Sequence, residues 1–200
     1  MAEMRLLEKL LVNNPLYAWM QRREVANLHR LAPLPAGLTI MDLGCGRGVE
    51  TALIAATFRP GRLVAFDLDR RQVLEAGRRL SHNGAADAAL LMADASRLPF
   101  GDERFDAAVE MAVMHHVPDW RAALREVVRV LKPGGSFHFL DISKRRYGIG
   151  MKLMGHDMQA LFTIDEFRTA LEDAGMTLER GIGRPVTPVF DMVGVARKAA

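Results

Sequence analysis

A glycine-rich turn at residues 44–48 is the part of the chain whose residue types and spacing most clearly indicate chemistry. A short apolar run ends in Asp42 and breaks into three glycines at alternate positions, and a helix-like segment follows at once. This order of strand, tight loop and helix start cradles nucleotide-like ligands, because a glycine lets the backbone approach the ligand closely. The spacing is G-x-G-x-G, and Val49 stands where a dinucleotide fingerprint requires its last small residue.

Two further acidic residues follow the next apolar runs, where the same ligand would need them. Asp67 ends the second run, and an acid about 20 residues beyond the glycines accepts hydrogen bonds from ribose hydroxyls. Asp94 ends the third run, where a carboxylate can accept from the adenine amine while the Ala95 N–H donates to a ring nitrogen. Each acid alone could instead be a carboxylate at the start of a loop that caps the next helix. Together with Asp42, they match three donor groups of one ligand.

The charge of Asp42 discriminates between two ligands that both contain adenosine. In a nicotinamide dinucleotide site, a carboxylate at the end of the first strand would repel the pyrophosphate. S-adenosylmethionine instead carries an ammonium and a sulfonium group, so the same carboxylate attracts it. The sequence therefore favours S-adenosylmethionine, and a nicotinamide-dependent oxidoreductase is the more distant alternative.

Apolar runs that alternate with helical patterns must position these residues. Strands are predicted at residues 38–43, 62–67, 88–92, 105–111 and 136–142, with two closing strands at 176–181 and 189–196. Helices are predicted at 49–58, at 70–80 and at 120–131, the last with Asp119 as its N-cap and a Lys-Pro-Gly-Gly stop at 132–135. Thr163 and Glu166 match a capping box, and Gly175 suits the end of that helix. Such alternation predicts an α/β fold with a largely parallel sheet, whose ligands bind at the carboxyl ends of the strands.

The chain is expected to form a single domain over residues 1–200. An N-terminal helical addition covers 1–35, with two helices broken at Asn13-Asn14-Pro15, and the cofactor-binding core covers 36–142. A Met- and Gly-rich insertion at 143–162 could form a lid, and 163–200 supply the C-terminal helix and the closing strands.

Together, the motifs make the chain similar to the class I S-adenosylmethionine-dependent methyltransferases. The resemblance covers roughly residues 38–196, and it is closest to the type 11, quinone-biosynthesis-like branch that methylates small molecules. The matching pieces are Asp42-Leu43-Gly44-Cys45-Gly46-Arg47-Gly48, Ala65-Phe66-Asp67-Leu68-Asp69, Ala93-Asp94-Ala95-Ser96-Arg97-Leu98-Pro99-Phe100, Phe105-Asp106, His115-His116-Val117-Pro118-Asp119 and Leu131-Lys132-Pro133-Gly134-Gly135.

This resemblance implies a Rossmann-like, doubly wound, seven-stranded sheet, mostly parallel with an antiparallel last strand, and with helices on both faces. It implies S-adenosylmethionine as cofactor, with the glycine turn near the methionine part, Asp67 at the ribose, and Asp94 with Ala95 at the adenine. Glu110 and Met111 would face the methionine part and the substrate. The cofactor-binding residues so implied are Asp42, Gly44, Cys45, Gly46, Gly48, Asp67, Leu68, Asp94, Ala95, Glu110 and Met111.

The reaction implied is an in-line displacement at an activated methyl group. Alignment of the two reactants can supply on the order of 7–11 kcal/mol of the barrier, and a base is needed only if the acceptor must lose a proton. Candidate bases are His115, His116 and Glu110, although one of these histidines could instead pack and bond backbone at the start of the next helix. Cys45 is expected to be there because it is small, and no histidine spacing predicts a metal site.

The composition limits the cellular setting and the partners. The chain has one cysteine, a formal net charge of +3, no secretory pattern and no apolar run long enough to span a bilayer, so a cytoplasmic protein is expected. The basic residues occur in short clusters, typical of solvated helix faces, and no nucleic-acid partner is expected. Leu6, Leu7, Leu10 and Leu11 could rest on a membrane surface, although intramolecular packing is the favoured interpretation. The sequence leaves open whether the protein is a monomer or a homodimer.

The methyl acceptor is expected to be a small molecule. An apolar pocket for it is suggested by Tyr17, Trp19, Met151, Met154, Met158, Leu161 and Phe162, which could equally pack the added segments onto the core. An RNA or protein methyltransferase and a non-catalytic S-adenosylmethionine-binding protein remain as alternatives.

Overall fold

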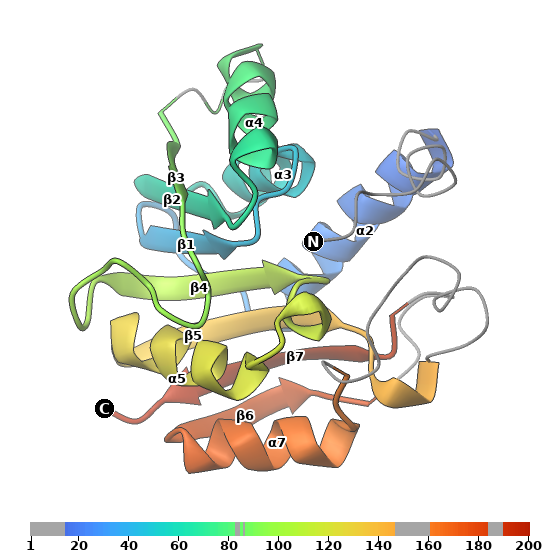
Figure 1. The fold of residues 1–200 in the computed structure, drawn as a ribbon, viewed down its shortest axis with the longest axis vertical. Helices are drawn as coiled ribbons and strands as arrows, with labels where there is room; N and C mark the ends of the chain where they lie inside the picture. Colours follow the sequence, from blue (N-terminus) through green and yellow to red (C-terminus); the bar gives the residue numbers. More distant parts are fainter. Residues whose placement is uncertain (1–14, 83–84, 86, 147–160, 184–189) are drawn as a thin grey trace.

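The computed structural model describes residues 15–82, 85, 87–146, 161–183 and 190–200. These residues form one seven-stranded sheet in the order β3-β2-β1-β4-β5-β7-β6, with helices on both faces (Figure 1). The strands are β1 (Thr39–Leu43), β2 (Arg62–Asp67), β3 (Ala89–Met92), β4 (Phe105–Met111), β5 (Leu131–Asp141), β6 (Met176–Gly181) and β7 (Met192–Lys198). The first five run parallel, and β7 is antiparallel to both β5 and β6. The predicted fold class is confirmed.

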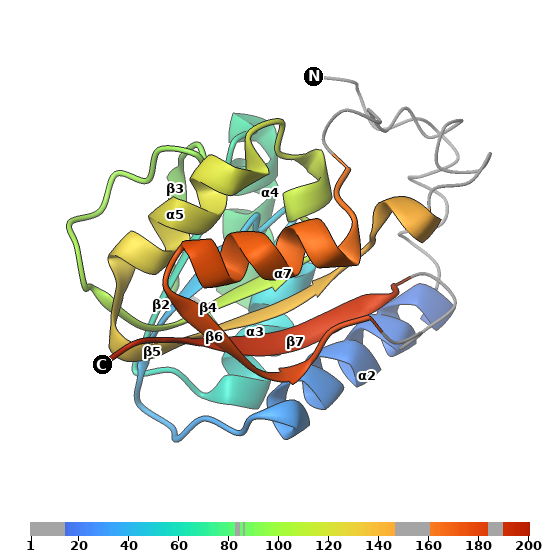
Figure 2. The same cartoon turned by 90° about the horizontal axis from the view of Figure 1, so that it is seen from below.

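The helices cover the sheet in two layers. One layer contains α2 (Pro15–Leu31), α3 (Val49–Phe58) and α4 (Arg70–His82), and the other contains α5 (Trp120–Val130) and α7 (Ile164–Asp173). Figure 2 shows α2 and α7 on opposite faces at the end of the sheet formed by β6 and β7. Two single 3-10 turns, η1 (Met114–His116) and η2 (Lys144–Arg146), follow β4 and β5. α2, early in the chain, therefore contacts β7, the last strand.

Each face of the sheet carries its own apolar core, because successive residues of a strand point to opposite faces. Ile40 of β1 packs in one cluster with Ile54 of α3. The next residue, Met41, lies in the larger cluster with Leu124 of α5 and Phe167 of α7. Ile40 and Met41 are both fully buried, as expected for a parallel sheet covered on both sides. The strands are thereby fixed, and with them the loops at their carboxyl ends.

Most predicted helix boundaries agree with the structure because their capping residues act as expected. The Asp119 carboxylate accepts a hydrogen bond of 2.9 Å from the Ala122 N–H at the start of α5. Thr163 and Glu166 form the reciprocal capping box of α7, and Gly175 follows that helix with a φ of +87°. α3 and β2 have the predicted bounds, and α4 continues two residues further than predicted, to His82.

The predicted start of the fifth strand is wrong. It was expected at Ser136, after a turn at 132–135, but β5 begins at Leu131. Leu131 pairs with Phe105 and Ser136 pairs with Ala107, so the residues between them form a bulge opposite a single residue of β4. The Lys-Pro-Gly-Gly segment therefore interrupts the ladder without separating helix from strand by a loop.

Smaller differences concern strand ends. The predictions place β1 and β3 one residue too early and end the fifth strand one residue too late, at 142. The last strand was expected at 189–196 but runs over Met192–Lys198, because its end pairs with Met176 at the start of β6. The first of the two predicted N-terminal helices, most of the expected lid, and the loop with Pro185 and Pro188 lie outside the described residues. The second N-terminal helix is α2, which begins at Pro15, as the expected break predicts.

Candidate functional site

The glycine turn connects β1 to α3 at the carboxyl edge of the sheet. The Cys45 N–H donates to the Phe66 carbonyl over 2.8 Å, which ties the turn to the end of β2. All three glycines of the turn have positive φ values, so the backbone there follows a path that other residues adopt at a cost. A side chain at Gly44 would lie 2.5 Å from Val113, in the loop after β4, whereas a Cβ at Gly46 would meet nothing within 4 Å. Gly44 is thus needed for packing, and Gly46 borders open space.

Asp67 holds the middle of this turn. Its Oδ2 accepts a hydrogen bond of 3.0 Å from the Gly46 N–H, and its Oδ1 accepts one of 2.9 Å from the Asp69 N–H. Burial raises the pKa of Asp67, and the backbone donors act in the opposite direction. Each carboxylate oxygen has two lone pairs, so Asp67 retains acceptor capacity for hydroxyl groups of a ligand.

Asp42 lies beneath the turn, at the first turns of α3. The Thr51 hydroxyl donates to its Oδ2 over 2.6 Å, and the side chain is buried. Burial, together with the negative charges of Glu50 and Asp67, raises the pKa of Asp42 to about 7, although the hydrogen bond from Thr51 acts in the opposite direction. Glu50 is half-buried, accepts a hydrogen bond from Gln21 of α2, and has a pKa raised by desolvation of its carboxyl group. Three carboxyl groups therefore surround the turn, and a cationic ligand would stabilise their ionised forms.

The third strand-end acid lies at the rim of the same edge. Asp94 is exposed, and its Oδ1 accepts hydrogen bonds from the Ser96 N–H at 2.8 Å and the Ser96 hydroxyl at 2.7 Å. No helix lies between β3 and β4, so these bonds shape the loop and do not cap a helix, as the alternative interpretation of this carboxylate required. Ala95 is buried beside it, and Leu68, directly after Asp67, is 55% exposed. An exposed large apolar side chain near a hydrogen-bonding rim suits a flat, partly apolar ligand such as a purine.

A second group of buried charged residues lies at the ends of β4 and β5. Glu110 Oε1 accepts hydrogen bonds from the Val113 N–H at 2.5 Å and the Met114 N–H at 3.3 Å. The Nδ1 atom of His115 lies 2.5 Å from Asp141 Oδ1, and Asp141 also accepts from the backbone N–H of His115. Burial, then the charge of Asp141, raises the pKa of Glu110 well above its ordinary value.

Sequence reasoning did not select Asp141. A usable signal was present, because Asp141 ends β5 just as Asp67 ends β2, and Asp42 is the second-last residue of β1. The candidate bases differ in their surroundings: His115 is buried in this group, whereas His116 is exposed, with its ring 4.0 Å from that of His115. One member of the histidine pair is thus buried, as expected, but the bond shown for its ring is to the Asp141 carboxylate and not to backbone.

The geometry agrees with comparisons to known proteins. A family model described as "Methyltransferase domain" matches residues 41–139. The chain is 30% identical to 27-O-demethylrifamycin SV methyltransferase of Amycolatopsis mediterranei, over 74% of this chain and 57% of that protein. It is 37% identical to a fatty-acid O-methyltransferase of Mycolicibacterium smegmatis, over 56% and 40%. A methyltransferase-like crystal structure from Bacillus halodurans superposes with a TM-score of 0.72 at 21% identity, covering 89% of this chain and 100% of the other.

The chain belongs to the class I S-adenosylmethionine-dependent methyltransferases. The type 11 branch predicted from the motifs is also supported. S-adenosylmethionine is the cofactor of this family. The chain spans 57% and 40% of the lengths of the two curated relatives named above.

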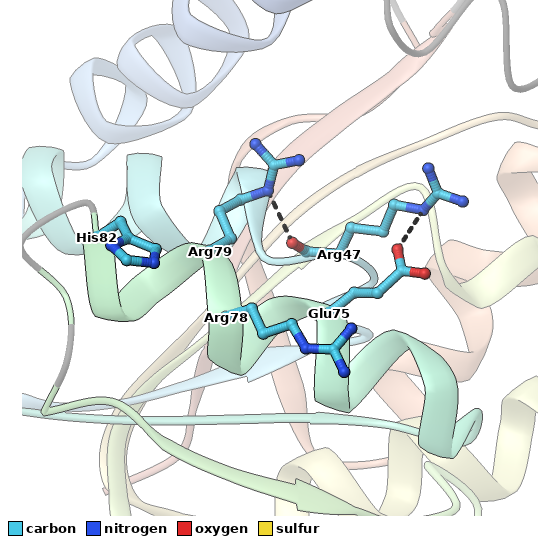
Figure 3. A pocket seen from close by; sticks show the side chains of 5 residues that line it. All are labelled: Arg47, Glu75, Arg78, Arg79 and His82. Carbon is cyan, nitrogen blue, oxygen red and sulfur yellow. Dashed lines mark hydrogen bonds and ion pairs between the residues drawn. The ribbon is translucent and has the colours of Figure 1, made fainter.

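A hollow of about 430 Å³, lined mostly by basic side chains, lies where α4 meets the glycine turn of this methyltransferase domain (Figure 3). Arg79 donates from Nε to the Arg47 carbonyl over 3.0 Å, and the Arg47 Nε lies 3.0 Å from a Glu75 carboxylate oxygen. The hollow is also lined by Arg78 and His82, on the exposed side of α4. Its lining contains none of the strand-end acids, so it is a separate feature that links α4 to the turn.

The remaining predicted residues have mainly packing contacts. Cys45 is fully buried with Ala65 and Ala76, and burial raises the pKa of its thiol, which fits the expectation that it is there because it is small. Met111 packs against two apolar clusters, one that includes Val109 of β4 and one that includes Leu140 of β5. Within the described part of the chain, no cluster of side chains is arranged to hold a metal ion, and no helix has the length and apolarity to cross a bilayer.

The residues suggested for an acceptor pocket do not all face one space. Phe162 is fully buried, with its ring 4.9 Å from those of both Trp120 and Phe167. It therefore packs α7 against α5, and Leu161 beside it is buried as well. Trp19 is 55% exposed on α2, with the Arg23 guanidinium 5.6 Å from its ring centre. The three methionines of the same set, 151, 154 and 158, lie outside the described residues.

Proposed function

We propose that this protein transfers a methyl group from S-adenosylmethionine to a small-molecule acceptor. The observation that carries the proposal is the set of carboxyl groups around the glycine turn, with Asp42 beneath it and Asp67 bonded to it. This set fits a ligand that combines ribose hydroxyls with ammonium and sulfonium charges, and it is unsuited to a pyrophosphate. The space beside Gly46 offers room for such a ligand.

The residues have separate tasks in this proposal. Asp67 accepts hydrogen bonds from the ribose hydroxyls, and Gly44, Gly46 and Gly48 let the backbone run close to the methionine part. Asp94 and Ala95 bind the edge of the adenine, with Leu68 against its face. Asp42, Glu110 and Met111 surround the methionine end, and Cys45 fills the space inside the turn. S-adenosylmethionine supplies a methyl group on a sulfonium, which needs no further activation.

The work of the protein is then to hold the acceptor atom in line with that methyl group and to exclude water. Alignment of this kind supplies on the order of 7–11 kcal/mol of a barrier. The names of the two relatives specify 27-O-demethylrifamycin SV and a fatty acid, which supports an acceptor of low molecular mass. A soluble cytoplasmic enzyme without a nucleic-acid partner is part of the same proposal.

Two measurements test the proposal. In calorimetric titrations, S-adenosylmethionine and S-adenosylhomocysteine should both bind at one site, and absence of binding would remove the cofactor assignment. The second measurement uses S-adenosylmethionine with a labelled methyl group and a cell extract separated into small molecules, RNA and protein. We expect the label in the small-molecule fraction. Label confined to RNA or protein would contradict the acceptor class, and binding without transfer to any fraction would indicate a non-catalytic protein.

A further inference from the structure

The hollow where α4 meets the glycine turn contains more positive than negative groups (Figure 3). Its lining comprises the guanidinium groups of Arg47, Arg78 and Arg79, the ring of His82, and one carboxylate, that of Glu75. This carboxylate is paired with Arg47. Within the part of the chain that the structure describes, no carboxylate lies within ion-pair distance of Arg78 or Arg79. The hollow therefore has positive charge that its own lining does not balance.

The size and the donors of this hollow suit a small molecule that carries a phosphate group. Its volume of about 430 Å³ lies within the range of pockets that hold small organic ligands. Guanidinium groups bind phosphate oxygens through pairs of parallel N–H donors, so arginine is better suited to this task than lysine. Arg78, Arg79 and His82 are exposed on α4, where a ligand can reach them from solvent, and the histidine ring adds a further N–H donor. A cationic ligand would find only Glu75 there, already paired with Arg47.

Two of the same arginines also support the glycine turn. Arg79 Nε donates a hydrogen bond of 3.0 Å to the carbonyl of Arg47, which lies within the turn. A Cβ at Gly48 would lie 3.0 Å from the Cα of Ala76, so α4 packs directly against the turn at this point. The charge of Arg79 also reaches Glu50: burial raises the pKa of Glu50, and Arg79 acts in the opposite direction. Groups that face the hollow therefore influence both the position and the electrostatics of the turn.

We propose that this hollow is an inhibitory site for a small molecule with a phosphate or diphosphate group. The bound anion draws Arg79 away from the Arg47 carbonyl and competes with Glu75 for the Arg47 guanidinium. Both changes remove support from the glycine turn, so the anion lowers the affinity for S-adenosylmethionine. Coupling between two binding sites is reciprocal, so the cofactor weakens anion binding by the same factor. The inhibitory effect rests on the proposed function, whereas anion binding depends only on the hollow.

Anion binding to the ligand-free protein gives the first test. Inorganic pyrophosphate and glycerol 3-phosphate are titrated calorimetrically at constant ionic strength, and we expect saturable binding of at least one of them at a single site. The tighter of the two probes identifies the kind of phosphate group that the site takes. Arg78→Gln should bind the probe about fivefold or more weakly, because charge-assisted hydrogen bonds are lost. Arg168→Gln, which changes an exposed arginine of α7 in the other helix layer, should bind it as the wild type does. No saturable binding of either probe, or equal losses in the two variants, would overturn the proposal.

The effect of the anion on cofactor binding gives the second test. S-adenosylhomocysteine is titrated into the wild type at increasing concentrations of the tighter probe, and we expect its affinity to fall about fivefold or more at saturation. In Arg78→Gln the affinity without probe should equal that of the wild type, and the half-maximal effect should require about fivefold more probe. Arg79→Met, which lacks the bond to the Arg47 carbonyl, should bind S-adenosylhomocysteine weakly even without probe, with little further loss when the probe is added. An affinity that stays constant up to saturating probe would overturn the inhibitory role. Failure of the wild type to bind S-adenosylhomocysteine would instead contradict the proposed function, while the anion titrations would still decide whether the site exists.

Discussion

The Gly46 N–H donates a hydrogen bond of 3.0 Å to Asp67 Oδ2, and this bond joins the middle of the glycine turn to the end of β2. The same carboxylate accepts from the Asp69 N–H, just before α4. Asp67 therefore shapes the turn before any ligand arrives, and a ligand that bonds to its remaining lone pairs meets a cradle already formed. Preorganisation of this kind lowers the cost of ordering on binding.

Replacement of Asp67 by alanine should weaken binding of S-adenosylmethionine by a few kcal/mol, because charge-assisted hydrogen bonds to the ribose are lost. Asp67→Asn, which keeps one acceptor oxygen, should lose less. Calorimetric titration measures both variants against Asp173→Ala, an exposed carboxylate at the end of α7 that lies in no part of the site. Unchanged affinity in Asp67→Ala would mean that the cofactor lies elsewhere.

Two glycines of the turn should respond differently to alanine. At Gly46 a Cβ would meet no protein atom, so Gly46→Ala should cost about 1–2 kcal/mol for its positive φ, yet block the space that the cofactor needs. At Gly44 a Cβ would lie 2.5 Å from Val113, whose N–H bonds to Glu110, so Gly44→Ala should lower the melting temperature more.

Thermal unfolding and cofactor titration separate these effects. We expect Gly46→Ala to lose cofactor affinity while its melting temperature falls by only a few degrees, less than that of Gly44→Ala. A Gly46→Ala variant that binds S-adenosylhomocysteine as tightly as the wild type would show that the open space is not the cofactor site.

The sequence was informative where signals are local. Caps such as Asp119 and Thr163 form bonds within one turn of their helices, so spacing alone predicted where α5 and α7 begin. The pairing of His115 with Asp141 joins residues 26 positions apart, on neighbouring loops, and depends on the register of β4 and β5. That register includes the bulge after Leu131, which depends on tertiary pairing. Acids at strand ends could be found from sequence, but their partners could not.

The raised pKa of Asp42 should make stability depend on pH. In the unfolded chain an aspartate titrates near 3.8, whereas folded Asp42 titrates near 7, so between these values the folded state binds more protons. The free energy of unfolding should therefore fall as pH rises from about 4 to 7, by a few kcal/mol from this group alone. Asp42→Asn removes the charge, and its amide oxygen can still accept from Thr51.

Chemical denaturation at pH 5 and pH 8 measures this contribution as the difference between wild type and Asp42→Asn. The variant should gain stability relative to the wild type at pH 8 and lose most of that advantage at pH 5. A difference that is the same at both pH values would contradict a raised pKa for Asp42.

The titration of Asp42 should also make cofactor binding depend on pH. Unlike the stability of the protein, the affinity for the cofactor should increase as the pH rises. A cationic ammonium group near Asp42 stabilises its carboxylate, so binding should release a proton below pH 7 and tighten as the pH rises. For a group titrating near 7, affinity for S-adenosylhomocysteine should rise by up to about tenfold between pH 6 and pH 8. Methylthioadenosine has the adenosine but lacks the amino acid part, so its affinity should stay nearly constant over this range. The pH dependence for S-adenosylhomocysteine should be absent in Asp42→Asn. If both ligands show equal pH dependence, Asp42 does not face the ammonium group, and the titrating residue must lie near the adenosine.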